Sequence, residues 1–198
     1  MLITGGAAVN ETVKTAIQSI KTQVYETYGM TETITHIAVK KLNKVSVKAL
    51  GKNVFNILPN ITITQDNREC LVIDAPNLSN TKITTNDVVK LHSKSSFEWL
   101  GRIDNAINTG GLKLFPEQLE AKLRPNIKQR FFITSMDDKT LGEKVVLIIE
   151  GSPYTLESNV FKRLNKNEIP KNIYFISQFS ETDSGKIQRS NTLRSLKR

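Results

Sequence analysis

The chain has 198 residues, of which 38% are hydrophobic and 24% are charged, enough to bury a sizeable core in one or two domains. No apolar run approaches the roughly 20 residues of a membrane-spanning helix, and the start, MLITGGAAVNETVK, lacks the pattern of a signal peptide. The single cysteine, Cys70, excludes a disulfide framework and a thiolate metal cluster, and it favours a reducing cytoplasm.

The net charge is +9, from 28 basic and 19 acidic residues. Such a balance raises the possibility of nucleic-acid binding, which requires cations gathered into a patch. Here the lysines are scattered, only the tail LRSLKR forms a basic run, and few aromatic residues lie among the cations. The scattered distribution of the basic residues therefore argues against nucleic-acid binding. The positive net charge also suits small anionic substrates.

The first half of the chain predicts mainly strands. Residues 2–6 (LITGG) predict a short buried strand that enters a glycine turn. Residues 10–20 predict a helix capped by Asn10, because their apolar residues recur at helical spacing. Residues 23–33 predict a strand that ends in a polar turn. Between Lys44 and Asp87 the short alternating stretches VSVKAL, NITITQ and ECLVID predict a small β-rich region.

The second half mixes helices and strands, so we expect an α/β or α+β fold. Pro116 at the start of FPEQLEAKL, followed by acidic residues, is typical of a helix beginning. The predicted elements in order are two strands within 96–114, a helix at 115–123, paired strands at 130–138 and 143–151, an amphipathic helix at 154–165, a strand at 173–179 and a terminal helix at 189–198. A domain boundary is expected between Arg102 and Asn105.

Four segments carry chemistry, and each is weak evidence when taken alone. They are TGGAAV at 4–9, YGMTET at 28–33, GRIDNAINTGGLKLFPEQLE at 101–120 and SETDSGKIQR at 180–189. Together, in this order, they resemble the adenylate-forming superfamily of acyl-CoA synthetases, luciferases and peptide-synthetase adenylation domains. The resemblance spans essentially the whole chain. It implies the C-terminal portion of a large adenylation domain at 1–103, followed by a small mobile lid domain at 104–198.

YGMTET supplies residue types that suit a magnesium nucleotide. An aromatic ring can stack on a purine, a hydroxyl can donate to phosphate, and a carboxylate is a hard ligand for Mg²⁺. The resemblance implies that Tyr28 flanks the adenine, that Thr31 contacts the α-phosphate as a catalytic residue and that Glu32 holds the metal. Gly29 would let the backbone approach the nucleotide. An ordinary turn at the end of a strand is the alternative.

Two further segments complete the implied nucleotide site. In the superfamily, the loop equivalent to Gly5, Gly6 and Ala7 lies against the acyl substrate and the edge of the adenine. TTND aligns with a TGD motif whose aspartate, here Asp87, binds the ribose hydroxyls, a role that suits a carboxylate. Asn86 replaces the glycine of that motif, which puts the geometry of the loop in question. A helix cap or turn cap is the alternative role of Asp87.

The segments after residue 100 imply a moving lid. Arg102 would add a hydrogen bond to the ribose, and Asp104 would be the hinge about which the lid rotates, although Asn105 departs from the family pattern. Gly110 and Gly111 would line the coenzyme A tunnel. The remaining implied residue is Lys186, the adenylation lysine, whose ammonium can neutralise charge that develops at the α-phosphate. Glu117 and Glu120 are expected to cap and solvate a helix, outside the site.

The resemblance implies a ligase that uses ATP, Mg²⁺ and coenzyme A to convert a carboxylic acid into a thioester through an acyl-adenylate. YGMTET followed by a compact β region is most similar to o-succinylbenzoate–CoA ligases of menaquinone biosynthesis. The alternatives are a short- or medium-chain fatty acyl-CoA synthetase and a non-catalytic nucleotide- or partner-binding module. The Pro-Lys phosphate loop of the superfamily is not among these residues, so we expect a truncated chain, inactive alone, that associates through its exposed first strand or is partly disordered there.

Overall fold

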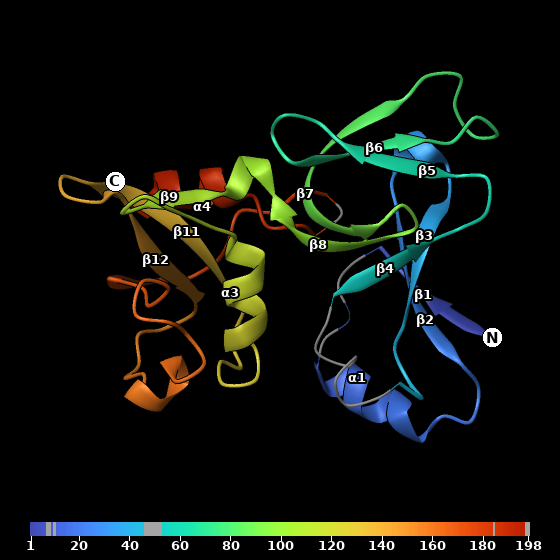
Figure 1. The fold of residues 1–198 in the computed structure, drawn as a ribbon. Helices are drawn as coiled ribbons and strands as arrows, with labels where there is room; N and C mark the ends of the chain where they lie inside the picture. Colours follow the sequence, from blue (N-terminus) through green and yellow to red (C-terminus); the bar gives the residue numbers. More distant parts are fainter. Residues whose placement is uncertain (7–8, 10, 46–52, 184, 197–198) are drawn as a thin grey trace. The chain divides into compact units, whose positions relative to one another are not determined.

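The computed structural model describes the chain apart from residues 7–8, 10, 46–52, 184 and 197–198 (Figure 1). The chain divides into two compact units, unit 1 at Met1–Asp104 and unit 2 at Asn105–Arg198. Both combine a sheet with short helices, which confirms the mixed α/β class. Within the described residues, no helix is long and apolar enough to span a membrane.

Unit 1 is built on an eight-stranded sheet in the order β1-β2-β3-β4-β8-β7-β6-β5. Its β1 and β2 are parallel, and the other neighbouring strands are antiparallel. The elements are β1 (Leu2–Thr4), α1 (Glu11–Ala16), η1 (Ile17–Ser19), β2 (Val24–Gly29), η2 (Thr31–Thr33), β3 (His36–Lys41), β4 (Val54–Ile57), β5 (Thr62–Gln65), β6 (Cys70–Asp74), β7 (Ile83–Ser93) and β8 (Ser96–Arg102). The 3-10 turn η3 (Ile103–Asn105) then leads out of unit 1.

The core of unit 1 lies mostly against β3 to β8. Alternate residues of these strands are buried together, as a two-residue period requires. Phe55 and Phe97 stack with their ring centroids 5.7 Å apart, and the single cysteine, Cys70, is completely buried in β6. A smaller cluster of Ile17, Val24 and Leu42 packs beneath η1.

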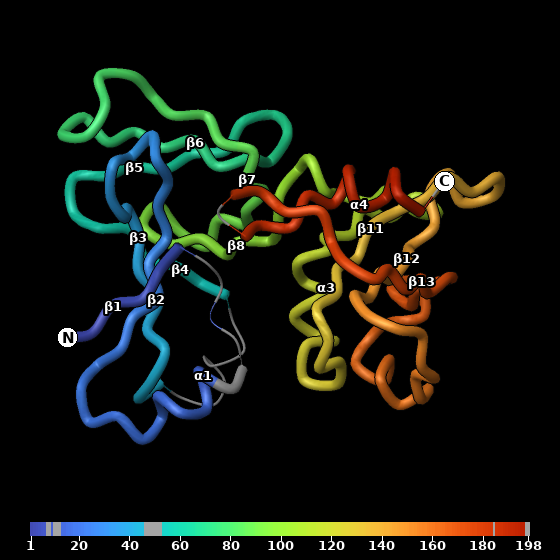
Figure 2. Tube along the Cα trace, turned by 180° about the vertical axis from the view of Figure 1, so that it is seen from behind, coloured from blue at the N-terminus to red at the C-terminus, as the bar shows by residue number. Residues whose placement is uncertain are grey.

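Unit 2 has a five-stranded sheet in the order β10-β9-β12-β11, with β13 paired parallel to β12. Figure 2 labels β11, β12 and β13 of this sheet. Strand residues alternate between its faces: Phe131 and Ile133 pack with helix α3, whereas Phe132 packs with helix α4. The elements are β9 (Ile107–Thr109), β10 (Leu112–Leu114), α3 (Pro116–Leu123), β11 (Phe131–Asp138), β12 (Gly142–Glu150), η4 (Ser158–Phe161), β13 (Asn172–Ile176) and α4 (Arg189–Leu196).

Three expectations about these elements are wrong. The first strand forms but is not buried: among the described strands β1 is the edge strand beside β2, and Leu2 and Ile3 are 50% and 54% exposed. The helix expected at 154–165 is a single 3-10 turn, η4. Ser, Thr and Asn compete there for backbone hydrogen bonds and lower helix propensity. Residues 96–114 hold three strands instead of two.

Two expectations lie outside the described residues. They are the cap at Asn10 and most of the VSVKAL stretch.

Candidate functional site

Three of the candidate nucleotide-binding residues meet in the sheet of unit 1. Tyr28 on β2 donates a hydrogen bond from its hydroxyl to Asp87 Oδ2 on β7, at 2.5 Å. Asp87 lies opposite Arg102 of β8 in the strand register, and its Oδ1 is 3.9 Å from Arg102 Nη1. The fold therefore brings a phenol, a carboxylate and a guanidinium together from residues up to 74 positions apart in the sequence numbering.

The Tyr28 ring is part of the core as well as of this site. Its centroid is 5.2 Å from that of Phe97, edge to face, and 5.6 Å from that of Phe55. Burial, and then the charge of Asp87, raise the pKa of the Tyr28 phenol above its ordinary value. The phenol therefore remains a hydrogen-bond donor at neutral pH and fixes the orientation of the Asp87 carboxylate.

Asp87 lies in strand β7, so TTND is not the loop that the family motif suggested. Its backbone amide donates to Thr85 Oγ1 at 3.0 Å. Asp87 itself is buried, with Oδ2 held by Tyr28. Oδ1 remains as the acceptor suited to a sugar hydroxyl.

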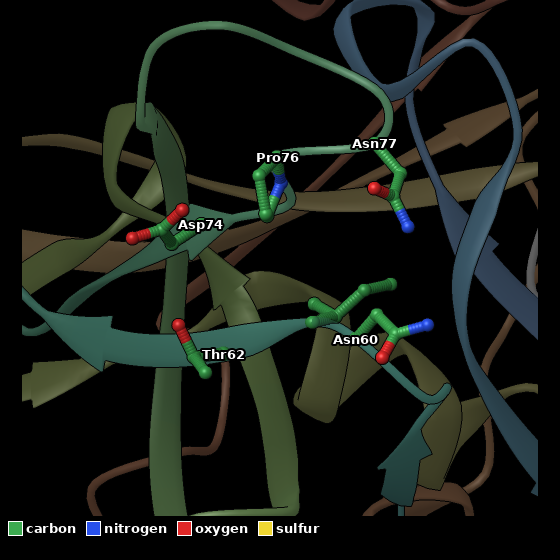
Figure 3. Close-up of a pocket in the computed structure, with 6 residues that line it drawn as sticks. Asn60, Thr62, Asp74, Pro76 and Asn77 are labelled. Carbon is green, nitrogen blue, oxygen red and sulfur yellow. The ribbon is translucent and has the colours of Figure 1, made fainter.

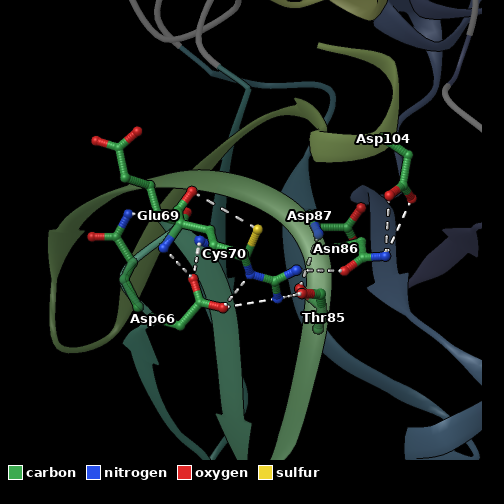
Figure 4. Close-up of polar contacts among 9 residues, drawn as sticks. Asp66, Glu69, Cys70, Thr85, Asn86, Asp87 and Asp104 are labelled. Atoms are coloured by element: carbon green, nitrogen blue, oxygen red, sulfur yellow. Dashed lines mark hydrogen bonds and ion pairs between the residues drawn. The ribbon is translucent and has the colours of Figure 1, made fainter.

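A line of polar contacts beside this site runs from Asp66 through Asn86 to Asp104 (Figure 4). Arg102 Nη2 donates to Asp104 Oδ2 at 3.0 Å, and the Asn86 amide nitrogen lies 3.2 and 3.3 Å from the two Asp104 oxygens. Asn86 in turn accepts from Arg68 Nη1 at 3.1 Å, and Arg68 pairs with Asp66 at 2.8 Å. Asn86, the departure from the family motif, thus contacts the expected hinge residue directly.

Thr31 and Glu32 are exposed on the 3-10 turn η2. Thr33, which sequence reasoning did not select, holds this turn. Its buried hydroxyl accepts from the Met30 amide at 3.1 Å and lies within donating distance of the Thr35 carbonyl, at 2.7 Å. The turn thereby presents the side chains of Thr31 and Glu32 to solvent.

The Glu32 carboxylate suits the way in which proteins bind magnesium nucleotides. Mg²⁺ is usually held by one or two carboxylates together with substrate phosphates, and it retains several waters. Glu32 offers one exposed carboxylate beside the Thr31 hydroxyl. In the described part of the chain, no group of three or more His, Cys, Asp or Glu side chains could hold a metal by itself. The donor set therefore fits a metal that arrives with a nucleotide.

Gly29 makes a close approach to the chain's own backbone. A Cβ at this position would lie 2.6 Å from the Thr35 carbonyl oxygen and 2.7 Å from His36 Cα. Gly29 is therefore required for packing, whatever its role toward a nucleotide. Gly5 and Gly6 follow β1 and are exposed, and Ala7 lies outside the described residues.

Gly110 and Gly111 form the turn between β9 and β10 in unit 2. Their φ angles are +55° and +79°, as a two-residue type I′ hairpin turn requires. The Gly110 amide donates to the Leu141 carbonyl at 2.9 Å. The described geometry gives these glycines a turn-forming role.

Lys186 is exposed on a hairpin of unit 2. Glu181 and Ile187 form an antiparallel bridge, and the Thr182 amide donates to the Lys186 carbonyl at 2.9 Å. The Lys186 amide donates to Thr182 Oγ1 at 3.1 Å, and Gly185 has φ +75°. The backbone of the candidate adenylation lysine is thus hydrogen-bonded on both its amide and its carbonyl to Thr182.

Glu120 is buried and not solvated, which corrects the expectation for this residue. Its Oε1 accepts from the Ile133 amide at 2.8 Å and lies 2.8 Å from Arg189 Nη1. Burial raises the pKa of the Glu120 carboxyl, an effect that Arg189 and the Ile133 amide oppose. Glu117 Oε1 accepts a hydrogen bond from the side-chain amide of Asn105 at 2.6 Å.

An open hollow of about 670 Å³ lies at the far edge of the unit 1 sheet (Figure 3). None of the candidate residues lines it. Its lining residues are Asn60, Ile61, Thr62, Asp74, Pro76 and Asn77. The candidate residues therefore lie outside this hollow.

Sequence comparison finds relatives among ligases. The chain is 25% identical to 2-succinylbenzoate–CoA ligase of Bacillus cereus, over 96% of the chain and 45% of that protein. It is 26% identical to the human mitochondrial acyl-coenzyme A synthetase ACSM5, over 95% of the chain and 39% of that protein. The chain spans less than half the length of these curated relatives. No protein-family model matches it.

Structural comparison agrees with this result. An AMP-forming acyl-CoA synthetase/AMP-acid ligase II-like protein from Dyadobacter fermentans is 34% identical, with a TM-score of 0.51 over 98% of the chain and 57% of that structure. The Bacillus subtilis o-succinylbenzoate CoA synthetase, solved with its acyl-adenylate intermediate, gives a TM-score of 0.81 at 18% identity, over 97% of the chain and 45% of that structure.

These findings confirm the resemblance predicted from the motifs. The relatives and structural neighbours are AMP-forming acyl-CoA synthetases, o-succinylbenzoate–CoA ligases among them, and the chain corresponds to their C-terminal part.

Proposed function

We propose that the chain acts as the C-terminal part of an AMP-forming acid–CoA ligase. The observation that carries the proposal is the meeting of Tyr28, Asp87 and Arg102 on three strands of unit 1. The sequence motifs independently assign the same three residues to one nucleotide. In this proposal, unit 1 is the end of the large adenylation domain and unit 2 is the mobile lid.

In the first half-reaction, a carboxylate oxygen of the acid attacks the α-phosphorus of ATP and pyrophosphate leaves. Asp87 and Arg102 bind the ribose hydroxyls, with Asp87 oriented by the Tyr28 phenol. Thr31 donates to the α-phosphate. Glu32 would hold Mg²⁺, which neutralises phosphate charge when it is bound. Lys186 places its ammonium against the charge that develops between the acid and the α-phosphate.

In the second half-reaction, the thiol sulfur of coenzyme A attacks the acyl carbon, the thiol proton is lost and AMP leaves. Asp104 is the proposed hinge for the lid rotation between the two steps. Gly110 and Gly111 form a narrow turn that would pass close to the pantetheine chain.

The acid is proposed to be o-succinylbenzoate. Support comes from the 2-succinylbenzoate–CoA ligase relatives and from the fold shared with the Bacillus subtilis synthetase. The human acyl-coenzyme A synthetase is similar to the same extent, which keeps another acyl-CoA synthetase as the second candidate. Its acid would be the short- or medium-chain fatty acid considered from the sequence.

ATP–pyrophosphate exchange tests the proposal. It would be run on the 198-residue chain and on the polypeptide of its complete reading frame, with o-succinylbenzoate and a panel of fatty acids. Exchange by the complete polypeptide supports the ligase, and the acid that supports exchange identifies the substrate. No pyrophosphate exchange with any acid, together with retained ATP binding, would instead indicate a non-catalytic nucleotide-binding module.

A further inference from the structure

The hairpin that carries Lys186 is held by an ion pair where it begins. Glu181, at its first strand, pairs with Arg130. Arg130 also lies 3.4 Å from Glu150 Oε2 of β12, and Glu150 Oε1 accepts from the Phe179 amide at 2.7 Å. The entering side of the hairpin is therefore tied to the sheet of unit 2 through one guanidinium.

A second ion pair holds the hairpin where it ends. Arg189, three residues after Lys186, has its Nη1 2.8 Å from Glu120 Oε1, and its Nη2 donates to Glu120 Oε2 at 3.1 Å. Arg189 Nη1 also donates to the Ile133 carbonyl at 2.7 Å. Only 22% of the Arg189 side chain and 12% of the Glu120 side chain are exposed.

Aromatic packing joins the two ion pairs into one support. Phe132 of β11 and Phe179 meet edge to face with centroids 5.1 Å apart. The Arg130 guanidinium lies 5.8 Å from the Phe179 ring, and that of Arg189 lies 5.6 Å from the Phe132 ring. The guanidinium groups of Arg130 and Arg189 are thus held both by ion pairs and by packing against aromatic rings, on either side of the exposed hairpin.

We propose that Glu120 and Glu181, acting through Arg189 and Arg130, are positioning residues that hold Lys186 in one orientation on unit 2. This inference rests on the proposed function, because it concerns how the adenylation lysine is presented. A lysine side chain has several rotatable bonds, and a loose loop would add backbone freedom that must be lost at each encounter with the substrate. A hairpin held on both sides has already lost this backbone freedom, so less conformational entropy is lost when Lys186 meets the substrate.

The competing explanation is that these pairs only stabilise unit 2. Helix α3 offers a matched control, since Lys122 Nζ lies 2.7 Å from both oxygens of Glu168. That pair ties the same helix to the segment at Asn165–Glu168, away from the ion pairs at the base of the hairpin. Lys122→Met therefore removes an ion pair of α3 and leaves the support of Lys186 in place.

The first arm of the test is amide hydrogen exchange on the 198-residue chain, followed by mass spectrometry. Glu120→Gln keeps the shape of the side chain and an acceptor for the Ile133 amide, but it removes the charge that faces Arg189. We expect exchange in the 182–188 peptide to rise on the order of tenfold, with the β11 and β12 peptides unchanged. Glu181→Gln, at an exposed pair, should give a smaller rise, and Lys122→Met none.

The second arm uses the polypeptide of the complete reading frame with the acid that supports exchange. Glu120→Gln should lower ATP–pyrophosphate exchange about tenfold through kcat, while thioester formation from a supplied acyl-adenylate stays within about twofold of wild type. A purely structural role would lower both reactions together.

Each outcome decides one claim. Unchanged exchange at 182–188 in both Glu120→Gln and Glu181→Gln overturns the inference. So does a loosened hairpin with undiminished pyrophosphate exchange. If the unaltered polypeptide shows no pyrophosphate exchange, the proposed function fails, and the hydrogen-exchange arm still decides whether the ion pairs order the hairpin.

Discussion

In unit 1 Tyr28, Asp87 and Arg102 lie on strands of the sheet, whereas in unit 2 Lys186 is exposed on a hairpin. Tyr28 and Asp87 are fixed by neighbouring strands and by the aromatic core. Lys186 is held indirectly, by the ion pairs Arg130–Glu181 and Arg189–Glu120 that flank its hairpin. Groups that bind a ground-state nucleotide can be built into a rigid surface. A group that acts in one of two half-reactions has to enter and leave, so only its support can be rigid.

The largest expected effect tests the lysine itself. Lys186→Ala should lower ATP–pyrophosphate exchange by roughly 100- to 1000-fold, because it removes a cation directed at developing charge. Thioester formation from a supplied acyl-adenylate should change far less. Lys139→Ala, an exposed lysine in the turn between β11 and β12, is the matched control and should behave as wild type. Equal losses in both half-reactions would contradict the assignment of Lys186 to adenylation.

The second prediction concerns the rigidity of unit 1. Gly29→Ala should destabilise unit 1 by about 3 kcal/mol, because the new Cβ would meet backbone atoms of Thr35 and His36 that cannot turn aside. Urea unfolding measures the change. Gly111→Ala in unit 2 is the control: its Cβ has nothing within 4 Å, so only its φ of +79° opposes alanine, at about 1 kcal/mol. Equal costs at the two glycines would disprove the close approach.

The third prediction removes one hydroxyl. Tyr28→Phe leaves the buried Asp87 carboxylate without its 2.5 Å donor and should cost about 1.5 kcal/mol of unfolding free energy. Nucleotide affinity, measured by calorimetry on the complete polypeptide, should fall with it because Asp87 loses its fixed orientation. Tyr25→Phe is the control, since that hydroxyl meets only the exposed Gln23. A Tyr28→Phe protein with unaltered affinity would remove Tyr28 from the site.

The smallest expected effect is a pH dependence in unit 2. Burial alone would raise the pKa of Glu168, but hydrogen bonds from Lys122 and the Asn165 amide outweigh burial and lower it below the ordinary 4.5. A lowered folded-state pKa means that the carboxylate stabilises the fold above pH 4.5 and loses this contribution as the pH falls. Glu168→Gln should therefore reduce Tm at neutral pH, by an amount equivalent to about 1 kcal/mol or less, and the difference should vanish in acid. A constant difference across the titration would contradict the shift.

The sequence predicted most elements whose patterns are local. The alternation in RFFITSMDD and EKVVLIIEG predicted β11 and β12, and Pro116 marked the start of α3. The helix prediction at 154–165 was wrong because Val160 and Leu164 are buried at helical spacing, yet a 3-10 turn at Ser158–Phe161 and the turn that follows it bury them. Burial spacing alone does not distinguish these two structures.

The sequence motifs single out candidate site residues, but no pattern marks the residues that support them. Tyr28, Asp87 and Arg102 belong to recognisable motifs, and the fold brings them together. Glu120 and Arg189 are 69 positions apart, and no local pattern marks a carboxylate that will be buried against a distant guanidinium. Asn86 was visible only as a departure from a glycine, and its contact with Asp104 depends on the pairing of distant strands.

The buried position of Cys70 allows the opening of unit 1 to be measured by thiol labelling of the unaltered chain. It is the only thiol in the chain, it belongs to unit 1, and it is 0% exposed in β6. A thiol reagent can reach it only when that strand opens, so the rate of labelling measures the opening free energy of unit 1. Because unit 2 contains no thiol, its opening leaves no direct label. One chemical reaction, with no engineered probe, can therefore report the stability of unit 1 separately from that of unit 2, which carries Lys186.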